Sequence, residues 1–209
     1  FEEETNLRSY LLIDTSSSMF YPQKQQITKL SFSVYAVACL IYLLRKQRDG
    51  FGLVHFSEQI DFFTSSKTTK KHFNRLLVEL DRLLSKSAVV TNRKTNFPKI
   101  VSELIEKIHE RSLVIIFSDM LSSENESLFE ALQHLRYKKN EVVLFHVQDS
   151  ETEKLFNFSN RPYNFIDLEN NSEIKLNPVN YKDDYIKTYS LFQKELQENC
   201  HKYKIDYVP

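Results

Sequence analysis

Oxygen-bearing side chains follow two apolar runs of the sequence at the point where each run ends. Asp14 follows the run 10–13 and begins a D-x-S-x-S pattern, and Asp119 comes shortly after the run 113–117. Carboxylate and hydroxyl oxygens are hard donors that suit Mg²⁺, Mn²⁺ or Ca²⁺ and disfavour zinc or copper. We therefore predict a divalent metal site with the ligands Asp14, Ser16, Ser18, Thr95 and Asp119.

Each of these residues, taken alone, has an ordinary structural explanation. Aspartate and serine after a strand are common in turns and helix caps, and Thr95 alone would be read as an N-cap. The joint occurrence favours the metal site, because both carboxylates end apolar strands and Thr95 precedes a helix between them. The spacing of two between Ser16 and Ser18 lets a loop aim both hydroxyls at one point beside Asp14.

Strands and helices alternate along the chain. The apolar runs predict strands at 10–13, 51–56, 59–63, 113–117, 142–147 and 205–208. Helical periodicity predicts helices at 27–48, 67–85, 96–110, 124–137 and 183–202. The segment 59–63 is close enough to 51–56 for an antiparallel hairpin, and 163–174 predicts a strand or short hairpin at the sheet edge.

Such alternation forms βαβ units that wind right-handed into a sheet with helices on both faces. We predict a single α/β domain over residues 1–209, a three-layer, doubly wound, mostly parallel sheet with one antiparallel edge strand. Ligands bind these folds outside the carboxyl ends of the strands, where strand order reverses, and the predicted metal site lies there. Because the sequence begins at Phe1 and not at methionine, we expect a fragment of a longer chain.

The segments around the predicted ligands resemble the metal-ion-dependent adhesion site of von Willebrand factor A domains. They are residues 11–19 (LLIDTSSSM), Thr95 and residues 115–119 (IIFSD). Residues 2–6 (EEETN), 53–57 (LVHFS) and 165–169 (FIDLE) further resemble an uncharacterised bacterial subfamily that is commonly encoded beside MoxR-type AAA+ ATPases. The resemblance covers nearly the whole chain and implies a von Willebrand factor A-like fold.

The resemblance also implies roles for the ligands. Ser16 and Ser18 would coordinate the metal directly, and Asp14 would do so directly or through water. Thr95 and Asp119 would exchange direct and water-mediated roles between states, and a sixth position would stay open for a partner's carboxylate. The family usually has glycine before the threonine, whereas this chain has Lys94. The Lys94 ammonium either competes with the metal or points to solvent.

A cation with a single carboxylate ligand keeps net positive character, so an acidic side chain of a partner would complete its shell favourably. We therefore predict a metal-dependent protein–protein interaction module without enzymatic activity. The resemblance implies a MoxR-type AAA+ ATPase as partner, in protein assembly or metal insertion. Met19, Phe20 and Tyr21 follow the loop and form either an apolar rim around the metal or packing onto the next helix.

Other functions fit the sequence less well. A haloacid-dehalogenase-like phosphotransferase also uses an aspartate after its first strand, but it needs a second acid where this chain has Ser16. A scaffold with an unused metal site is the other alternative, and Lys94 is the hint for it. The two glycines, Gly50 and Gly52, exclude a glycine-rich phosphate loop. Basic and acidic residues are equal in number, 28 each, which disfavours nucleic-acid binding.

The remaining reactive side chains are scattered. Of the six histidines, His55 and His146 are expected within strands and the others on helix surfaces. Cys39 and Cys200 are too few for a disulfide framework, which favours a reducing compartment, and we expect both to be buried or half-buried. The longest apolar run, 34–44, is too short to span a bilayer, and no secretory signal is present, so we expect a cytoplasmic protein.

Overall fold

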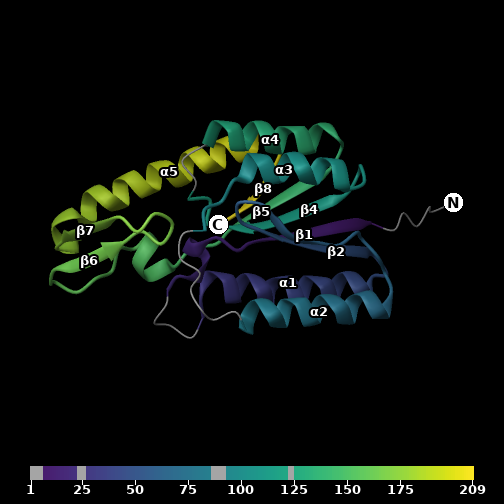
Figure 1. The fold of residues 1–209 in the computed structure, drawn as a ribbon. Coiled ribbons are helices and arrows are strands. Elements are labelled where there is room, and N and C mark those ends of the chain that lie inside the picture. Colours follow the sequence, from purple (N-terminus) through teal and green to yellow (C-terminus); the bar gives the residue numbers. More distant parts are fainter. Residues whose placement is uncertain (1–6, 23–26, 86–92, 122–124) are drawn as a thin grey trace.

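The computed structural model describes residues 7–22, 27–85, 93–121 and 125–209. Its central feature is a six-stranded sheet with the strand order β3-β2-β1-β4-β5-β8 (Figure 1). The strands are β1 (Arg8–Asp14), β2 (Gly50–Phe56), β3 (Ile60–Phe63), β4 (Leu113–Ser118), β5 (Glu141–His146) and β8 (Asp206–Val208). β3 runs antiparallel to β2, and the other neighbouring strands are parallel.

Helices cover both faces of the sheet. α1 (Lys29–Lys46) and α2 (Lys70–Ser85) lie on one face, and α3 (Phe97–Lys107), α4 (Asn125–Tyr137) and α5 (Lys182–Lys202) lie on the other (Figure 1). Val37 and Leu76 belong to the apolar core on the first side, and Leu132 and Leu196 to the core on the second. The predicted three-layer, mostly parallel sheet with one antiparallel edge strand is therefore confirmed.

The segment after β5 differs from the prediction of a strand or hairpin at the sheet edge. β6 (Tyr163–Ile166) and β7 (Glu173–Leu176) form an antiparallel hairpin, but it is a separate two-stranded sheet. The edge position beside β5 is taken by β8. Phe156, which precedes the hairpin, links it to the start of α5, since its ring stacks on Phe165 of β6 at 6.1 Å and on Tyr185 of α5 at 4.1 Å between ring centroids.

Short helical turns at the strand ends were not predicted. They are η1 (Ser17–Phe20), the π-type turn η2 (Ser150–Lys154) and η3 (Pro178–Tyr181). The first two follow β1 and β5, so they lie at the carboxyl ends of the strands, where the metal site is predicted. Among the helices of the described residues, none has the length and apolar character needed to cross a membrane.

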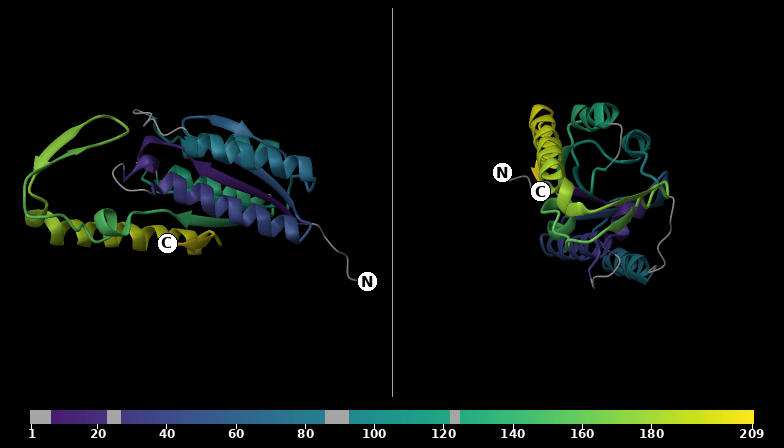
Figure 2. Two further views of the ribbon diagram at one scale, coloured as in Figure 1. Left: turned by 90° about the horizontal axis from the view of Figure 1, so that it is seen from below. Right: turned by 90° about the vertical axis from the view of Figure 1, so that its left-hand side faces the viewer.

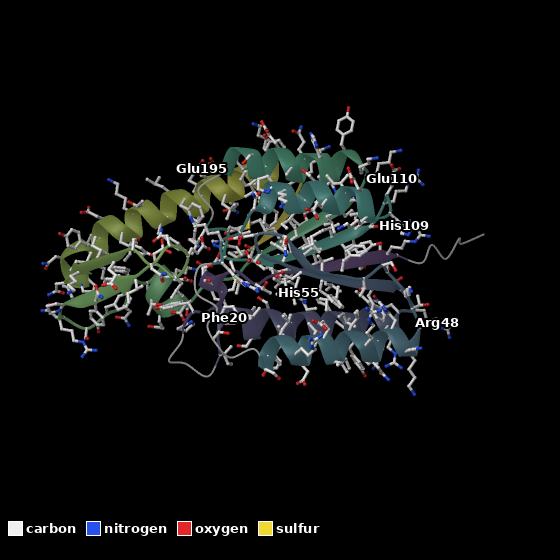
Figure 3. All side chains as sticks on the ribbon, viewed as in Figure 1. Phe20, Arg48, His55, His109, Glu110 and Glu195 are labelled. Carbon is white, nitrogen blue, oxygen red and sulfur yellow. The ribbon has the colours of Figure 1, made fainter. Side chains whose placement is uncertain are left out.

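Two expectations about single side chains are wrong. Cys39 is exposed, because it lies on the outer face of α1 with Tyr35 and Tyr42, whereas Cys200 is buried as expected. His72 is buried and not on a helix surface, because its Nε2 lies 2.8 Å from the Phe51 carbonyl oxygen under α2. The histidines do not cluster, as His55 and His109 illustrate (Figure 3).

The close packing of β2 gives a first prediction. A Cβ atom on Gly52 would lie 2.6 Å from the Thr64 carbonyl oxygen and 3.0 Å from the Tyr10 ring. We expect Gly52→Ala to lower the free energy of unfolding by about 1–3 kcal/mol in urea denaturation, because backbone must shift to admit the methyl group. In Gly50→Ala the new methyl group meets the Ser66 hydroxyl, which can rotate, so the loss should be smaller. Equal losses in the two variants would contradict this expectation.

Candidate metal centre

The sheet brings the two acidic motifs together. β1 and β4 are parallel neighbours, and Ile13 is level with Phe117 in their register. Asp14 and Asp119 therefore leave the sheet at the same edge, and both are almost completely buried, at 1% and 4% exposed. Burying two carboxylates this closely is unfavourable unless other groups satisfy them.

Three hydroxyl and amide groups satisfy Asp14. Its Oδ1 accepts a hydrogen bond of 2.9 Å from the Ser16 backbone N–H, a turn that aspartate commonly forms after a strand. Its Oδ2 accepts a hydrogen bond of 2.7 Å from Ser118 Oγ. Thr95 Oγ1 lies 3.1 Å from both oxygens. Ser118 was not among the predicted ligands, although it stands beside Asp119 in the motif.

The two predicted serine ligands lie side by side, as their spacing predicts. Ser16 precedes the η1 turn and Ser18 is in it, and their hydroxyl oxygens are 3.1 Å apart. The Ser18 hydroxyl also helps to lower the pKa of the Asp119 carboxylate, so the loop after β1 lies beside the end of β4.

Thr95 does not cap the helix that follows it. Asn96 is the N-cap of α3, and its side chain accepts a hydrogen bond of 3.3 Å from the Lys99 backbone N–H. The Thr95 hydroxyl is therefore available to Asp14. Four of the five predicted ligands, Asp14, Ser16, Ser18 and Thr95, are thus connected by hydrogen bonds, and Asp119 lies beside Asp14 and Thr95 at the same end of the sheet.

Lys29 is a buried cation in this site and was not predicted from the sequence. Its Nζ lies 2.9 Å from Asp119 Oδ2 and 2.6 Å from Glu153 Oε1, and its side chain is 2% exposed. Burial alone would lower the pKa of Lys29, but the Asp119 and Glu153 carboxylates raise it above its ordinary value. Burial would likewise raise the pKa of Asp119, but the Lys29 ammonium holds it below the usual range.

The position of Lys29 follows from the start of α1. Thr28 is the N-cap, its Oγ1 accepts a hydrogen bond of 3.1 Å from the Ser31 N–H, and Ser31 Oγ accepts one of 2.8 Å from the Thr28 N–H. A lysine in the first turn opposes the helix dipole, which favours anions there. That mismatch is the feature of the sequence that favours carboxylates near Lys29.

Both carboxylates, Asp14 and Asp119, line a small cavity of about 10 Å³, whereas the predicted ligands Ser16 and Ser18 do not line it. It is lined by Asp14, Thr95, Phe97, Ser118, Asp119, Met120, Leu121 and Glu169. Burial raises the pKa of Asp14 to about 6, and the neighbouring Asp119 carboxylate adds to the rise. Burial also raises the pKa of Glu169 to about 7, with further contributions from Asp119 and Asp14.

These observations fit a small divalent cation. The cavity has room for about one water molecule or ion, and its polar side chains carry oxygen atoms. The pKa values of Asp14 and Glu169 are raised chiefly by burial, and neighbouring carboxylates add to the rise. Within the described residues, no three or more histidine, cysteine, aspartate or glutamate side chains meet as metal ligands. The predicted set differs from such a cluster, because it combines two carboxylates with three hydroxyls.

The sequence drew attention to Lys94 and to the apolar residues 19–21 around the predicted metal. Lys94 is exposed, so it points to solvent, and Lys29 is the cation at the site. Met19 is fully buried in the core with α1 and forms no rim, whereas Phe20 and Tyr21 are half-buried. Tyr21 donates a hydrogen bond of 2.6 Å from its hydroxyl to Thr152 in η2.

The burial of the Asp14 carboxylate beside Asp119 gives a stability prediction. We expect Asp14→Asn without metal to be more stable than wild type by roughly 3 kcal/mol at pH 8, because a pKa shift of one unit is worth about 1.4 kcal/mol. The folded wild type binds its proton more tightly than the unfolded chain, so it gains stability as the pH falls from about 6 toward about 4. The variant lacks this gain, and its advantage should shrink at pH 5.

Urea denaturation at pH 8 and pH 5 measures both effects. Asp206→Asn, an exposed substitution at the start of β8, is the control and should match wild type at both pH values. An Asp14→Asn variant that is less stable than wild type at pH 8 would show that the hydrogen bonds to the Asp14 carboxylate outweigh the cost of burying its charge beside Asp119.

Comparisons with known proteins place the fold and the family. The structure is similar to that of the conserved hypothetical protein BatB from Bacteroides thetaiotaomicron, with a TM-score of 0.54 and 13% identity over 95% of this chain and 98% of that chain. It is also similar to an aerotolerance-related membrane protein from Bacteroides fragilis, with a TM-score of 0.53 and 13% identity over 97% and 90% of the two chains.

The SpRpn10 VWA domain matches with a TM-score of 0.41 and 12% identity over 66% of this chain and 74% of that one. No curated protein sequence matches the chain significantly. The sequence profile of the family described as "Protein of unknown function DUF58" matches residues 1–193. This match covers most of the chain, which therefore belongs to the DUF58 family.

Proposed function

We propose that this domain is a divalent-metal-dependent protein-interaction module. The observation that carries the proposal is the ion-sized cavity lined by Thr95 and by the buried carboxylates of Asp14 and Asp119. The hydroxyls of Ser16 and Ser18 lie 3.1 Å apart beside Asp14, which accepts a hydrogen bond from the Ser16 N–H. Mg²⁺ or Mn²⁺ suits this all-oxygen set. When bound, the ion would supply a positive centre that an acidic side chain of a partner can approach.

The surroundings of the site support docking of a protein. A larger cavity of about 360 Å³ adjoins Ser18 and Lys29, and it is lined in part by Phe156, Phe158 and Phe165. An apolar surface beside a charged anchor is typical of protein interfaces. We propose an acidic residue of a MoxR-type AAA+ ATPase as the occupant, in protein assembly or metal insertion, and that partner is suggested by the sequence resemblance alone.

One alternative has an observation in its favour. Because Lys29 already supplies a cation to Asp119, the domain could be a scaffold that keeps the adhesion-site residues without using a metal. We do not propose an enzyme, because Ser16 stands where a phosphotransferase of the haloacid-dehalogenase kind needs its second acid. A cytoplasmic location also remains part of the proposal, and the unpaired Cys39 and Cys200 are compatible with it.

Metal binding should stabilise the fold. At a metal concentration about 100-fold above the Kd, we expect Mg²⁺ or Mn²⁺ to raise the Tm of the wild type by roughly 5–10 °C. Asp14→Asn should respond weakly because it lacks a ligand charge, whereas Asp206→Asn should respond like wild type. No shift in the wild type at millimolar metal, or the same shift in Asp14→Asn, would favour the scaffold.

The interaction with a partner should depend on the metal. We expect calorimetric titration with a MoxR-type ATPase encoded beside this protein to detect binding in Mg²⁺ and to show no binding in EDTA. The double variant Ser16→Ala and Ser18→Ala should weaken binding by about 2–5 kcal/mol, the usual loss when a desolvated charged contact is truncated. Ser190→Ala, an exposed serine of α5, is the control. Equal binding in Mg²⁺ and EDTA would show that the contact does not use this site.

A further inference from the structure

Glu169 faces the metal centre from the tip of the β6–β7 hairpin. It lines the cavity of about 10 Å³ together with Asp14, Thr95 and Asp119, and it lines the larger cavity of about 360 Å³ together with Ser18. The hairpin bends back toward the carboxyl ends of the strands (Figure 2, left). An acidic side chain of the chain itself thus stands on the side of the site from which a partner would approach.

The turn that presents Glu169 is built by Asp167. The Asp167 side chain accepts a hydrogen bond of 2.8 Å from the Glu169 N–H, and its backbone carbonyl accepts one of 2.8 Å from the Asn171 N–H. The Asp167 N–H in turn donates to the Ser172 carbonyl at 2.9 Å. These bonds fix the backbone of the tip, so Glu169 is held at the site by the fold of the hairpin.

The hairpin has no strand pairing with the main sheet. Its attachment to the rest of the domain includes aromatic packing, in which Phe156 stacks between Phe165 of the hairpin and Tyr185 of α5. Removing the tip from the metal centre therefore breaks no hydrogen bond of the six-stranded sheet.

The balance of charge at the cavity explains why an additional carboxylate such as Glu169 would bind a metal ion there. The Lys29 ammonium is shared between Asp119 and Glu153, so it offsets the charge of Asp119 only in part, and Asp14 and Asp119 together would leave a divalent ion with some positive charge. Glu169 supplies a further carboxylate at the same cavity. Without a cation the carboxylates repel one another, and among the described residues they do not meet as a three-acid metal cluster.

We propose that Glu169 is a resident acid that takes the place of the partner's acidic residue at the metal centre until the partner displaces it. The inference rests on the proposed function, because it presupposes that the site binds a divalent ion. It means that partner binding is a competition between two carboxylates for one position. The hairpin then tunes affinity for the partner without altering the ligands on the sheet.

The proposed role of Glu169 can be tested in the 209-residue protein with Mn²⁺ as the ion and acetate as a small competing carboxylate. Glu169→Gln keeps the shape of the side chain and removes its charge, and Glu173→Gln in β7 of the same hairpin is the matched control, since Glu173 is exposed and bonded to Asn164. Calorimetry with Mn²⁺ should show Glu169→Gln binding about tenfold more weakly than wild type, in the range found when a supporting metal contact is lost. Glu173→Gln should match wild type.

Acetate reports whether the position is open. At saturating Mn²⁺, the protein-bound ion should relax the acetate methyl protons several-fold more strongly in Glu169→Gln than in wild type or Glu173→Gln. If Mn²⁺ affinity and acetate relaxation are both unchanged in Glu169→Gln, the proposed role of Glu169 is wrong, whereas the proposed metal site is unaffected. Weaker Mn²⁺ binding without more acetate relaxation, or tighter Mn²⁺ binding, would also overturn it. Absence of Mn²⁺ binding in all three proteins would instead overturn the proposed function and this inference with it.

Discussion

The burial of two carboxylates at the ends of neighbouring strands is the constraint on which the rest of this edge of the molecule depends. Asp14 ends β1 and Asp119 follows β4, and the parallel pairing of these strands brings both buried carboxylates to the same end of the sheet. Low dielectric strengthens their repulsion, so each needs close polar partners. The loop after β1, the start of α1 and the start of α3 all supply such partners.

The two carboxylates are compensated differently, and this difference bears on function. Asp119 has a charged partner in Lys29, whereas Asp14 has the neutral donors Ser118, Thr95 and the Ser16 N–H. Asp14 is therefore a buried carboxylate without a cationic side chain among its hydrogen-bond partners in the described part of the chain, and a divalent ion would supply the missing positive charge. Lys29 limits the total charge, and so it sets how strongly the site attracts a cation.

Contacts that depend on strand order could be predicted from the sequence, whereas contacts that depend on where the chain reverses direction could not. Alternating strands and helices place Asp14, Thr95 and Asp119 at one edge, and the structure brings them together. Lys94 drew attention because it neighbours Thr95 in sequence, whereas the buried ammonium comes from Lys29, whose position depends on where α1 begins. Glu169 belongs to the segment 165–169, which resembles the bacterial subfamily. Its place at the site could not be predicted, because the sequence suggested a strand or hairpin at the sheet edge, whereas the hairpin is a separate sheet that reaches the site.

Helix α5 has a mechanical consequence. Its first half packs on the hairpin side through Tyr185, its second half enters the core through Leu196 and Cys200, and the chain then continues into β8. With 21 residues it is roughly 30 Å long and has no proline to bend it. The C-terminal half of this straight helix is fixed in the core beside the edge strand β8. A tilt of the helix would therefore move the tip of the hairpin relative to the carboxyl ends of the strands.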